Sequence, residues 1–231
     1  MGYLTDRVAQ VAITVVLVMA SAIVHEVAHG WAALRLGDPT AKEAGRLTLD
    51  PRAHLDGFGS IVLPLIMALA GGPVFAFARP VPYNPSRLRH PRRDEVLVAL
   101  AGPASNLAQA VVGAALLGLL DRSVAWVAAT SAGLEVAYWA YAILLSYVRV
   151  NLVLCFFNLI PLPPLDGSKV VLFFLTGRAR ARYYELQGYS MAILLAVLYV
   201  LPGLLHVDPL SSYLDATAGT VMRVLLGWAV G

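Results

Sequence analysis

Residues 8–36 read VAQVAITVVLVMASAIVHEVAHGWAALRL, an almost uninterrupted apolar run. About 20 mostly apolar residues are enough for a helix to cross a bilayer, so this stretch predicts a membrane-spanning helix. A signal peptide is the alternative, because Arg7 precedes the run and Ala20-Ser21-Ala22 resembles a cleavage site. Cleavage there would cut through the apolar stretch and leave residues 24–30 at a new terminus, so we favour the spanning helix.

The composition of the whole chain also indicates a membrane protein. Of its 231 residues 59% are hydrophobic and 13% charged, and the mean hydropathy is +0.72, whereas soluble proteins carry about 25% charged residues. This excludes a soluble globular enzyme, and 17 Lys and Arg against 14 Asp and Glu are too few to coat a nucleic acid. Cys155 is the sole cysteine, which excludes a disulfide framework. Further apolar stretches follow at 58–78, 96–120, 134–161, 189–205 and 212–230.

These stretches predict an all-α polytopic membrane protein with five to six transmembrane segments. The polar connections between them are too short to form a folded soluble domain. We therefore expect one membrane-embedded domain over residues 1–231, with a core at about 8–170 and additional spans within 189–230.

The first apolar run contains His25-Glu26-Val27-Ala28-His29, an HExxH pattern. Residues four apart on a helix differ by about 40° in direction, so both imidazoles project from one face and can share a metal ion. Glu26 falls beside that face, within reach of an activated water. Ionisable groups inside an apolar span are costly unless they pair or bind something. The alternative without metal places the motif at the helix end, among lipid headgroups with Trp31.

A catalytic zinc site takes three protein ligands, so one further ligand is needed. His54, His90, His206 and the carboxylates are the candidates, and two Leu-Asp-Gly triplets supply Asp56 and Asp166. Asp56 lies in a polar connection, where a solvated turn aspartate is ordinary. Asp166 follows three prolines that end a long apolar helix, and irregular backbone near membrane depth is tolerated where protein or a watery cavity surrounds it. We therefore favour Asp166.

HEVAH in one membrane segment, followed by Asn158-Leu-Ile-Pro-Leu-Pro-Pro-Leu-Asp-Gly167 at the end of a later one, resembles the site-2 protease family of intramembrane zinc metalloproteases. Further similar blocks lie at 47–51 with His54, at 80–85 and at 101–106. The resemblance implies a Zn²⁺ ion held by His25, His29 and Asp166, with Glu26 activating water to cleave a peptide bond in a membrane-embedded substrate. The chain is similar to the short prokaryotic branch, which carries no PDZ or CBS domain.

Several other polar residues accompany these motifs. We predict a catalytic role for Asn106, either donating to the developing oxyanion or holding the substrate backbone, with an interhelical hydrogen bond as the alternative. Asn158 is expected to orient Asp166, and Asn151 to be structural. His54 is expected in an exposed loop and His90 in a headgroup-facing cluster, while Arg149 has no evident partner.

One zinc joining the first and fourth apolar segments requires their ends to lie on the same side of the membrane. Segment 58–78 then suits a re-entrant element, and residues 80–85 suit a short extended strand beside the site that pairs with unwound substrate. The positive-inside rule places this side toward the cytoplasm, the amino terminus outside and the carboxyl terminus inside. The basic residues that fall on it are Arg35, Lys42, Arg46, Arg52, Arg79, Arg87, Arg89, Arg92, Arg93, Lys169, Arg178, Arg180 and Arg182. The alternative is a conventional six-span topology with both termini inside and the 35–57 connection outside.

The expected function is that of an intramembrane zinc endopeptidase. Its expected partners are the lipid bilayer and a membrane protein or peptide substrate, with no nucleic acid. The alternative is a non-catalytic metal-binding membrane protein or a divalent-cation transporter, for which polar residues along several spans would be expected. A structural scaffold without metal is a third possibility.

Overall fold

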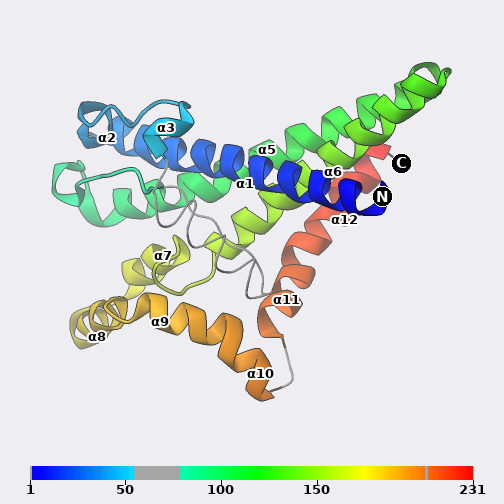
Figure 1. The fold of residues 1–231 in the computed structure, drawn as a ribbon. Coiled ribbons are helices and arrows are strands. Elements are labelled where there is room, and N and C mark those ends of the chain that lie inside the picture. The colour runs from blue at the N-terminus through cyan, green and yellow to red at the C-terminus, as the bar shows by residue number, and fades with distance from the viewer. Residues whose placement is uncertain (1, 55–78, 206–207, 231) are drawn as a thin grey trace.

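The computed structural model describes residues 2–54, 79–205 and 208–230, and within these residues every element is helical (Figure 1). Three long helices dominate the fold, and shorter helices connect or flank them. In chain order the elements are α1 (Gly2–Arg35), α2 (Thr40–Glu43), α3 (Pro51–His54), η2 (Pro85–Arg87), α5 (Pro91–Val127), α6 (Ser131–Asn158), α7 (Gly167–Phe174), α8 (Gly177–Gln187), α9 (Ser190–Leu195), η3 (Ala196–Val200), α10 (Leu201–Leu205), α11 (Pro209–Leu214), η4 (Asp215–Gly219) and α12 (Thr220–Val230).

The long helices α1, α5 and α6 pack on one another and form the body that holds the site. Each is long and apolar enough to cross a membrane, over Ala9–Arg35, Pro91–Val127 and Ser131–Asn158. Figure 1 shows the amino terminus and the turn between α5 and α6 at one end of this body, and α2 and α8 at the other. Local sequence sets where α5 and α6 begin. Pro91 is in the first turn of α5, and the Thr130 side chain accepts a hydrogen bond from the backbone N–H of Gly133 at the start of α6.

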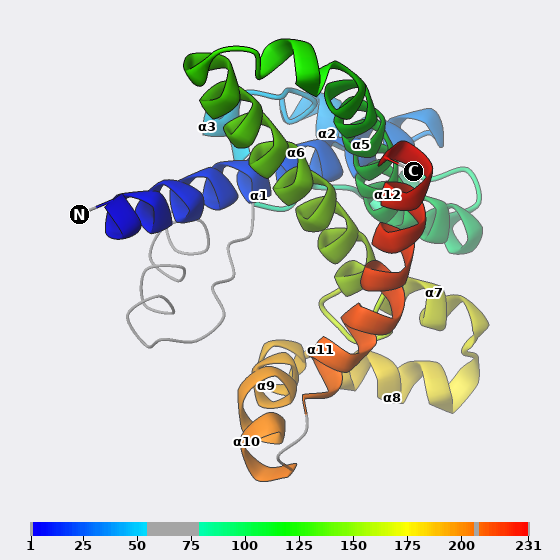
Figure 2. The same cartoon turned by 90° about the vertical axis from the view of Figure 1, so that its right-hand side faces the viewer.

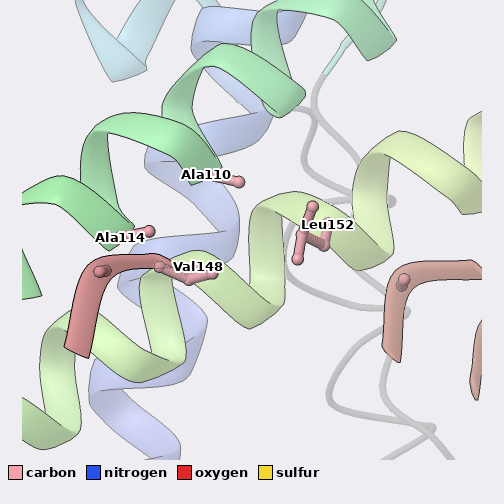
Figure 3. Close-up of a cluster of buried hydrophobic side chains, with 6 residues drawn as sticks. Ala110, Ala114, Val148 and Leu152 are labelled. Carbon is pink, nitrogen blue, oxygen red and sulfur yellow. The ribbon is translucent and has the colours of Figure 1, made fainter. Parts of the chain in front are cut away.

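Small side chains allow α5 and α6 to approach closely. Ala110 and Ala114 of α5 meet Val148 and Leu152 of α6 in a fully enclosed apolar cluster (Figure 3). Small residues at a helix contact let backbones come near, which favours packing within a bilayer. The cluster is completed by Ala218 and Ala229 from the carboxyl-terminal helices.

The carboxyl-terminal helices run back along the α5–α6 pair (Figure 2). Residues 209–230 form one helical run with a π-helical turn at η4, which spans about 33 Å at 1.5 Å per residue. In α5, a Cβ atom at Gly118 would collide with the carbonyl oxygen of Ala229, so glycine permits this contact. Three described helices meet the length and composition of a span. The predicted five to six spans therefore stay a prediction, and segment 58–78 lies outside the described residues.

The predicted strand at residues 80–85 is not present: residues 79–84 have no regular structure, η2 begins at Pro85, and no strand occurs in the part of the chain that is described. Prolines at 80, 82 and 85 remove the N–H groups that a strand ladder needs. Two of the remaining donors go to side chains instead, since the Val81 N–H donates to Glu26 at 2.8 Å and the Asn84 N–H donates to Asp38 at 2.5 Å.

Asp38, which sequence reasoning did not single out, joins this segment to the end of α1. Its side chain is fully buried and accepts hydrogen bonds from the Thr40 N–H, the Thr40 hydroxyl and the Asn84 N–H. The preceding Gly37 has φ +113°, a conformation that favours glycine, and the Arg89 N–H donates to the Leu36 carbonyl at 3.1 Å. Burial alone would raise the pKa of Asp38, but the bonds from Thr40 and Asn84 lower it below its usual value.

We expect Asp38→Asn to destabilise the protein by about 2 kcal/mol at pH 7, because hydrogen bonds to a buried charge are lost. This corresponds to a midpoint lower by about 5 °C in a thermal melt of the purified protein. A carboxylate with a lowered folded-state pKa contributes stability above its unfolded pKa and loses it as pH falls through the folded one. The difference between variant and wild type should therefore shrink below about pH 4, and a difference that grew in acid would contradict this assignment.

Candidate metal centre

His25 and His29 lie one turn apart on α1 and face the packed interior, with 6% and 9% of their surfaces exposed. Their Nε2 atoms are 3.0 Å apart. An oxygen of Asp166, which is distant in sequence, lies 3.1 Å from Nε2 of His25 and 3.4 Å from Nε2 of His29. The structure thus brings together three side chains that carry metal-binding atoms.

The turn after α6 delivers Asp166 to this place. Asp166 immediately precedes α7, yet its side chain makes no capping hydrogen bond to that helix. A Cβ atom at the next residue, Gly167, would collide with the carbonyl oxygens of Leu159 and Ile160. Glycine therefore lets the turn fold tightly against the end of α6, which leaves the Asp166 carboxylate free to face α1.

Hydrogen bonds to the far side of each ring determine which nitrogen is available. His29 Nδ1 lies 2.7 Å from the carbonyl oxygen of Val98, and His25 Nδ1 lies 2.6 Å from the side-chain oxygen of Asn106. A carbonyl oxygen only accepts, so each Nδ1 carries a proton and donates. Each neutral ring then presents the lone pair of Nε2 to the interior, which is the form that binds a metal.

These three groups fit a zinc ion. Two imidazole lone pairs and a carboxylate are all acceptors, and Oδ2 of Asp166 is buried without a hydrogen-bond donor. Ligand atoms around tetrahedral zinc lie about 3.3 Å apart, close to the three distances seen here. A cation bound here would favour the ionised form of the Asp166 carboxyl.

Gly102 of α5 forms one wall of the site. A Cβ atom at this position would lie 2.5 Å from Nε2 of His25 and 2.5 Å from Nε2 of His29. The missing side chain therefore keeps space next to both metal-facing atoms. Sequence reasoning used Gly102 only as part of a block, and its function as a wall depends on how α5 packs on α1.

Glu26 lies beside the two histidines without belonging to the three-residue cluster. One of its carboxylate oxygens accepts the Val81 N–H at 2.8 Å. The irregular segment before η2 thus holds the carboxylate through a backbone donor. Glu26 is not one of the three clustered metal-binding residues, and its role as a general base stays a prediction.

Asn106 is fully buried, and both the oxygen and the NH₂ group of its side-chain amide have hydrogen-bond partners. Its oxygen faces His25, and its NH₂ group donates to Asn151 at 2.9 Å. Asn151 in turn donates to the hydroxyl of Ser21 and to the Tyr147 carbonyl, each at 3.0 Å. The chain of contacts joins α1, α5 and α6 behind His25. This geometry supports a role in orienting His25, while donation by Asn106 to an oxyanion stays a prediction.

The remaining sequence-based assignments have mixed outcomes. His54, expected in an exposed loop, is buried, and its Nε2 lies 2.7 Å from the Thr48 carbonyl. Asn158, expected to orient Asp166, donates to Leu154 within its own helix. His90 and Arg149 are both exposed, and a headgroup-facing place for His90 stays a prediction. Asp56 and His206 lie outside the described residues.

We expect Asn106→Ala to weaken zinc binding about 10-fold to 100-fold, because the ring of His25 loses the acceptor that fixes its tautomer. Asn151→Ala should shift the affinity in the same direction by less. Competition with a chromogenic chelator measures the dissociation constant, and Asn158→Ala is the matched control. An Asn106→Ala protein that binds zinc normally but fails to cleave would instead favour the oxyanion role.

Comparison with known proteins agrees with this chemistry. The model of Peptidase family M50 matches residues 122–201, which include Asp166. YwhC of Bacillus subtilis (strain 168), named as a zinc metalloprotease, is 38% identical over 200 residues, covering 86% of this chain and 82% of YwhC. Rip2 of Mycolicibacterium smegmatis, also named as a zinc metalloprotease, is 28% identical over 221 residues, covering 91% of this chain and 79% of Rip2. No solved structure matches the chain significantly.

Proposed function

Because the chain belongs to peptidase family M50 and is an integral membrane zinc metalloprotease, we propose that it cleaves its substrates within the membrane. The scissile bond lies in or near the transmembrane segment of another membrane protein. The observation that carries this proposal is the place of the metal-binding atoms among three helices that are each long enough to span a bilayer.

The depth of the site supports cleavage inside the bilayer. His29 precedes the end of α1 at Arg35 by six residues, and His25 by ten. At 1.5 Å per residue the two rings lie about 9 and 15 Å along the helix from that end. With Arg35 placed at the membrane surface in this proposal, a substrate bond enters below that surface to reach the two rings.

In this proposal His25, His29 and Asp166 hold the zinc. Bound zinc supplies Lewis acidity that polarises the scissile carbonyl and makes a neighbouring water more acidic. Glu26, held by the Val81 N–H, takes the proton from that water and passes it to the leaving amine. Asn106 keeps the His25 ring in the tautomer that can bind the metal.

The proposed topology is multi-pass, with the catalytic end toward the cytoplasm. The basic residues of the connections 35–54 and 79–93, and those of α8, lie at the end of the body where the metal site is. An excess of Lys and Arg marks the cytoplasmic side of a membrane protein. The run 209–230 is long enough to supply a further span.

A divalent-cation carrier is the alternative, but the buried polar side chains favour a protease. Within the described residues, the buried polar side chains of the three long helices other than Asp94 in the first turn of α5 gather at one level. They are Ser21, Asn106 and Asn151, together with the two histidines. A transport path requires polar groups along its length.

The test is zinc-dependent cleavage of membrane proteins in proteoliposomes. Purified protein is reconstituted with detergent-extracted membrane proteins, and new amino termini are mapped by mass spectrometry, with chelator, after zinc is restored, and with Glu26→Gln. We expect new termini within or beside transmembrane segments that require both zinc and Glu26. New termini confined to soluble domains would contradict intramembrane cleavage, and metal flux without cleavage would favour the carrier.

A further inference from the structure

The amino end of helix α7, which follows Asp166, contacts the first turns of α5. The ammonium group of Lys169 lies 3.3 Å from a carboxylate oxygen of Glu95, with 28% and 14% of the two side chains exposed. The same oxygen accepts a hydrogen bond from the hydroxyl of Tyr83 at 3.2 Å. A cation in the first turn of a helix is opposed by the helix dipole, so Glu95 offsets an otherwise unfavourable position for Lys169.

Arg92, three residues before Glu95 on α5, contacts the carboxyl end of α7. One guanidinium nitrogen donates to the carbonyl oxygens of Phe173 at 2.8 Å and Leu175 at 3.1 Å. These are among the carbonyls that a helix leaves without partners at its end. The guanidinium also lies 5.8 Å from the centre of the Phe173 ring. Arg92 and Glu95 together therefore hold α7 by its two ends.

Helix α7 needs such support to keep a fixed position. It has eight residues, and helices of this length are marginal without tertiary contacts. Asp166 sits directly before its first residue and is not tied to α7 by a capping bond. A shift of α7 would therefore carry the carboxylate away from the two histidines.

The same helix α5 also holds both histidines. The Val98 carbonyl accepts from His29, and Asn106 faces His25. Arg92 and Glu95 add the third group through α7. Helix α5 thus contacts both histidines directly and contacts the helix that follows Asp166, although none of the three metal-binding side chains belongs to α5.

We propose that Arg92 and Glu95 are positioning residues for the zinc site. They fix α7 on α5 and so keep the Asp166 carboxylate at ligand distance from His25 and His29. This inference depends on the proposed function, in which Asp166 is a zinc ligand.

The test compares the zinc affinity of full-length variants in detergent by competition with a chromogenic chelator. We expect Arg92→Met and Glu95→Gln each to raise the dissociation constant about 10-fold to 100-fold, the range typical when support of a ligand is lost. Arg93→Met is the matched control. Arg93 lies on the same helical turn and is exposed, and its substitution by Met removes the same charge. Arg92→Lys keeps a donor and should recover part of the affinity.

A double-mutant cycle tests the ion pair itself. If Glu95 acts through Lys169, the combined Glu95→Gln and Lys169→Met protein should lose little more affinity than either single variant. A purely structural role would lower the melting temperature while the zinc affinity stayed at the value of Arg93→Met, and that result would overturn the proposal.

Asp166→Ala separates this inference from the site assignment. If Asp166→Ala binds zinc as tightly as the wild type, the ligand assignment itself fails. If Asp166→Ala loses zinc but Arg92→Met and Glu95→Gln match Arg93→Met, only the positioning role fails.

Discussion

Glu26→Gln is expected to keep the zinc ion and to lose cleavage of membrane substrates. The amide has nearly the shape of the carboxylate and still offers an oxygen to the Val81 N–H, so the site should remain assembled. It cannot take a proton from water, and general acid–base catalysis contributes about 10²-fold to 10⁴-fold. We therefore expect a loss of at least 100-fold in the rate at which new termini form, measured in proteoliposomes.

The control for Glu26→Gln is its zinc content and affinity, which should equal those of the wild type. Loss of zinc would mean that Glu26 supports the metal rather than the chemistry. Undiminished cleavage with zinc bound would show that another group acts as the base.

Gly102→Ala should disable the site by filling the space beside the histidine rings. The added methyl would lie 2.5 Å from Nε2 of His25 and 2.5 Å from Nε2 of His29, closer than carbon and nitrogen atoms can approach. Both rings are held from behind by Asn106 and Val98, so relief requires displacing a ring or α5. A displacement of about 1 Å costs on the order of 100-fold in rate, and we expect zinc affinity to fall as well.

Gly227→Ala is the matched control for this substitution. Gly227 lies in α12, and a Cβ atom there would meet no neighbouring atom within 4 Å. The same glycine-to-alanine change should leave zinc affinity and cleavage unaltered. Wild-type zinc affinity in Gly102→Ala would show that the rings can move apart without cost and would contradict the assignment of Gly102 as a wall.

The membrane class and the catalytic motif are readable from the sequence because both depend on local patterns. Residues 8–36 are apolar over more than the thickness of a bilayer, whatever packs against them. His25 and His29 share a face because the helical repeat places them there. The proline-rich turn before Asp166 is likewise a local signal, since three prolines within residues 161–164 cannot continue a regular helix.

The supporting contacts could not be predicted in this way, because they join residues far apart in the chain. Asn151 bonds Ser21 across 130 positions and Asn106 across 45. Polar residues within apolar helices are a sequence signal for buried contacts. This signal does not indicate which of these polar residues contact one another in the fold. The irregular form of residues 79–84 and the burial of His54 depend similarly on what surrounds them.

Sequence alone therefore determined that this is an α-helical membrane protein with two histidines and a glutamate on one helix turn. Only the tertiary structure decided that Asp166 lies within 3.4 Å of both rings, that Asn106 stands behind His25, and that Asp38 ties the segment holding Glu26 to the end of α1. The physical reason is that helix periodicity is set by neighbours in the chain, whereas these distances are set by how α1, α5, α6 and α7 pack together.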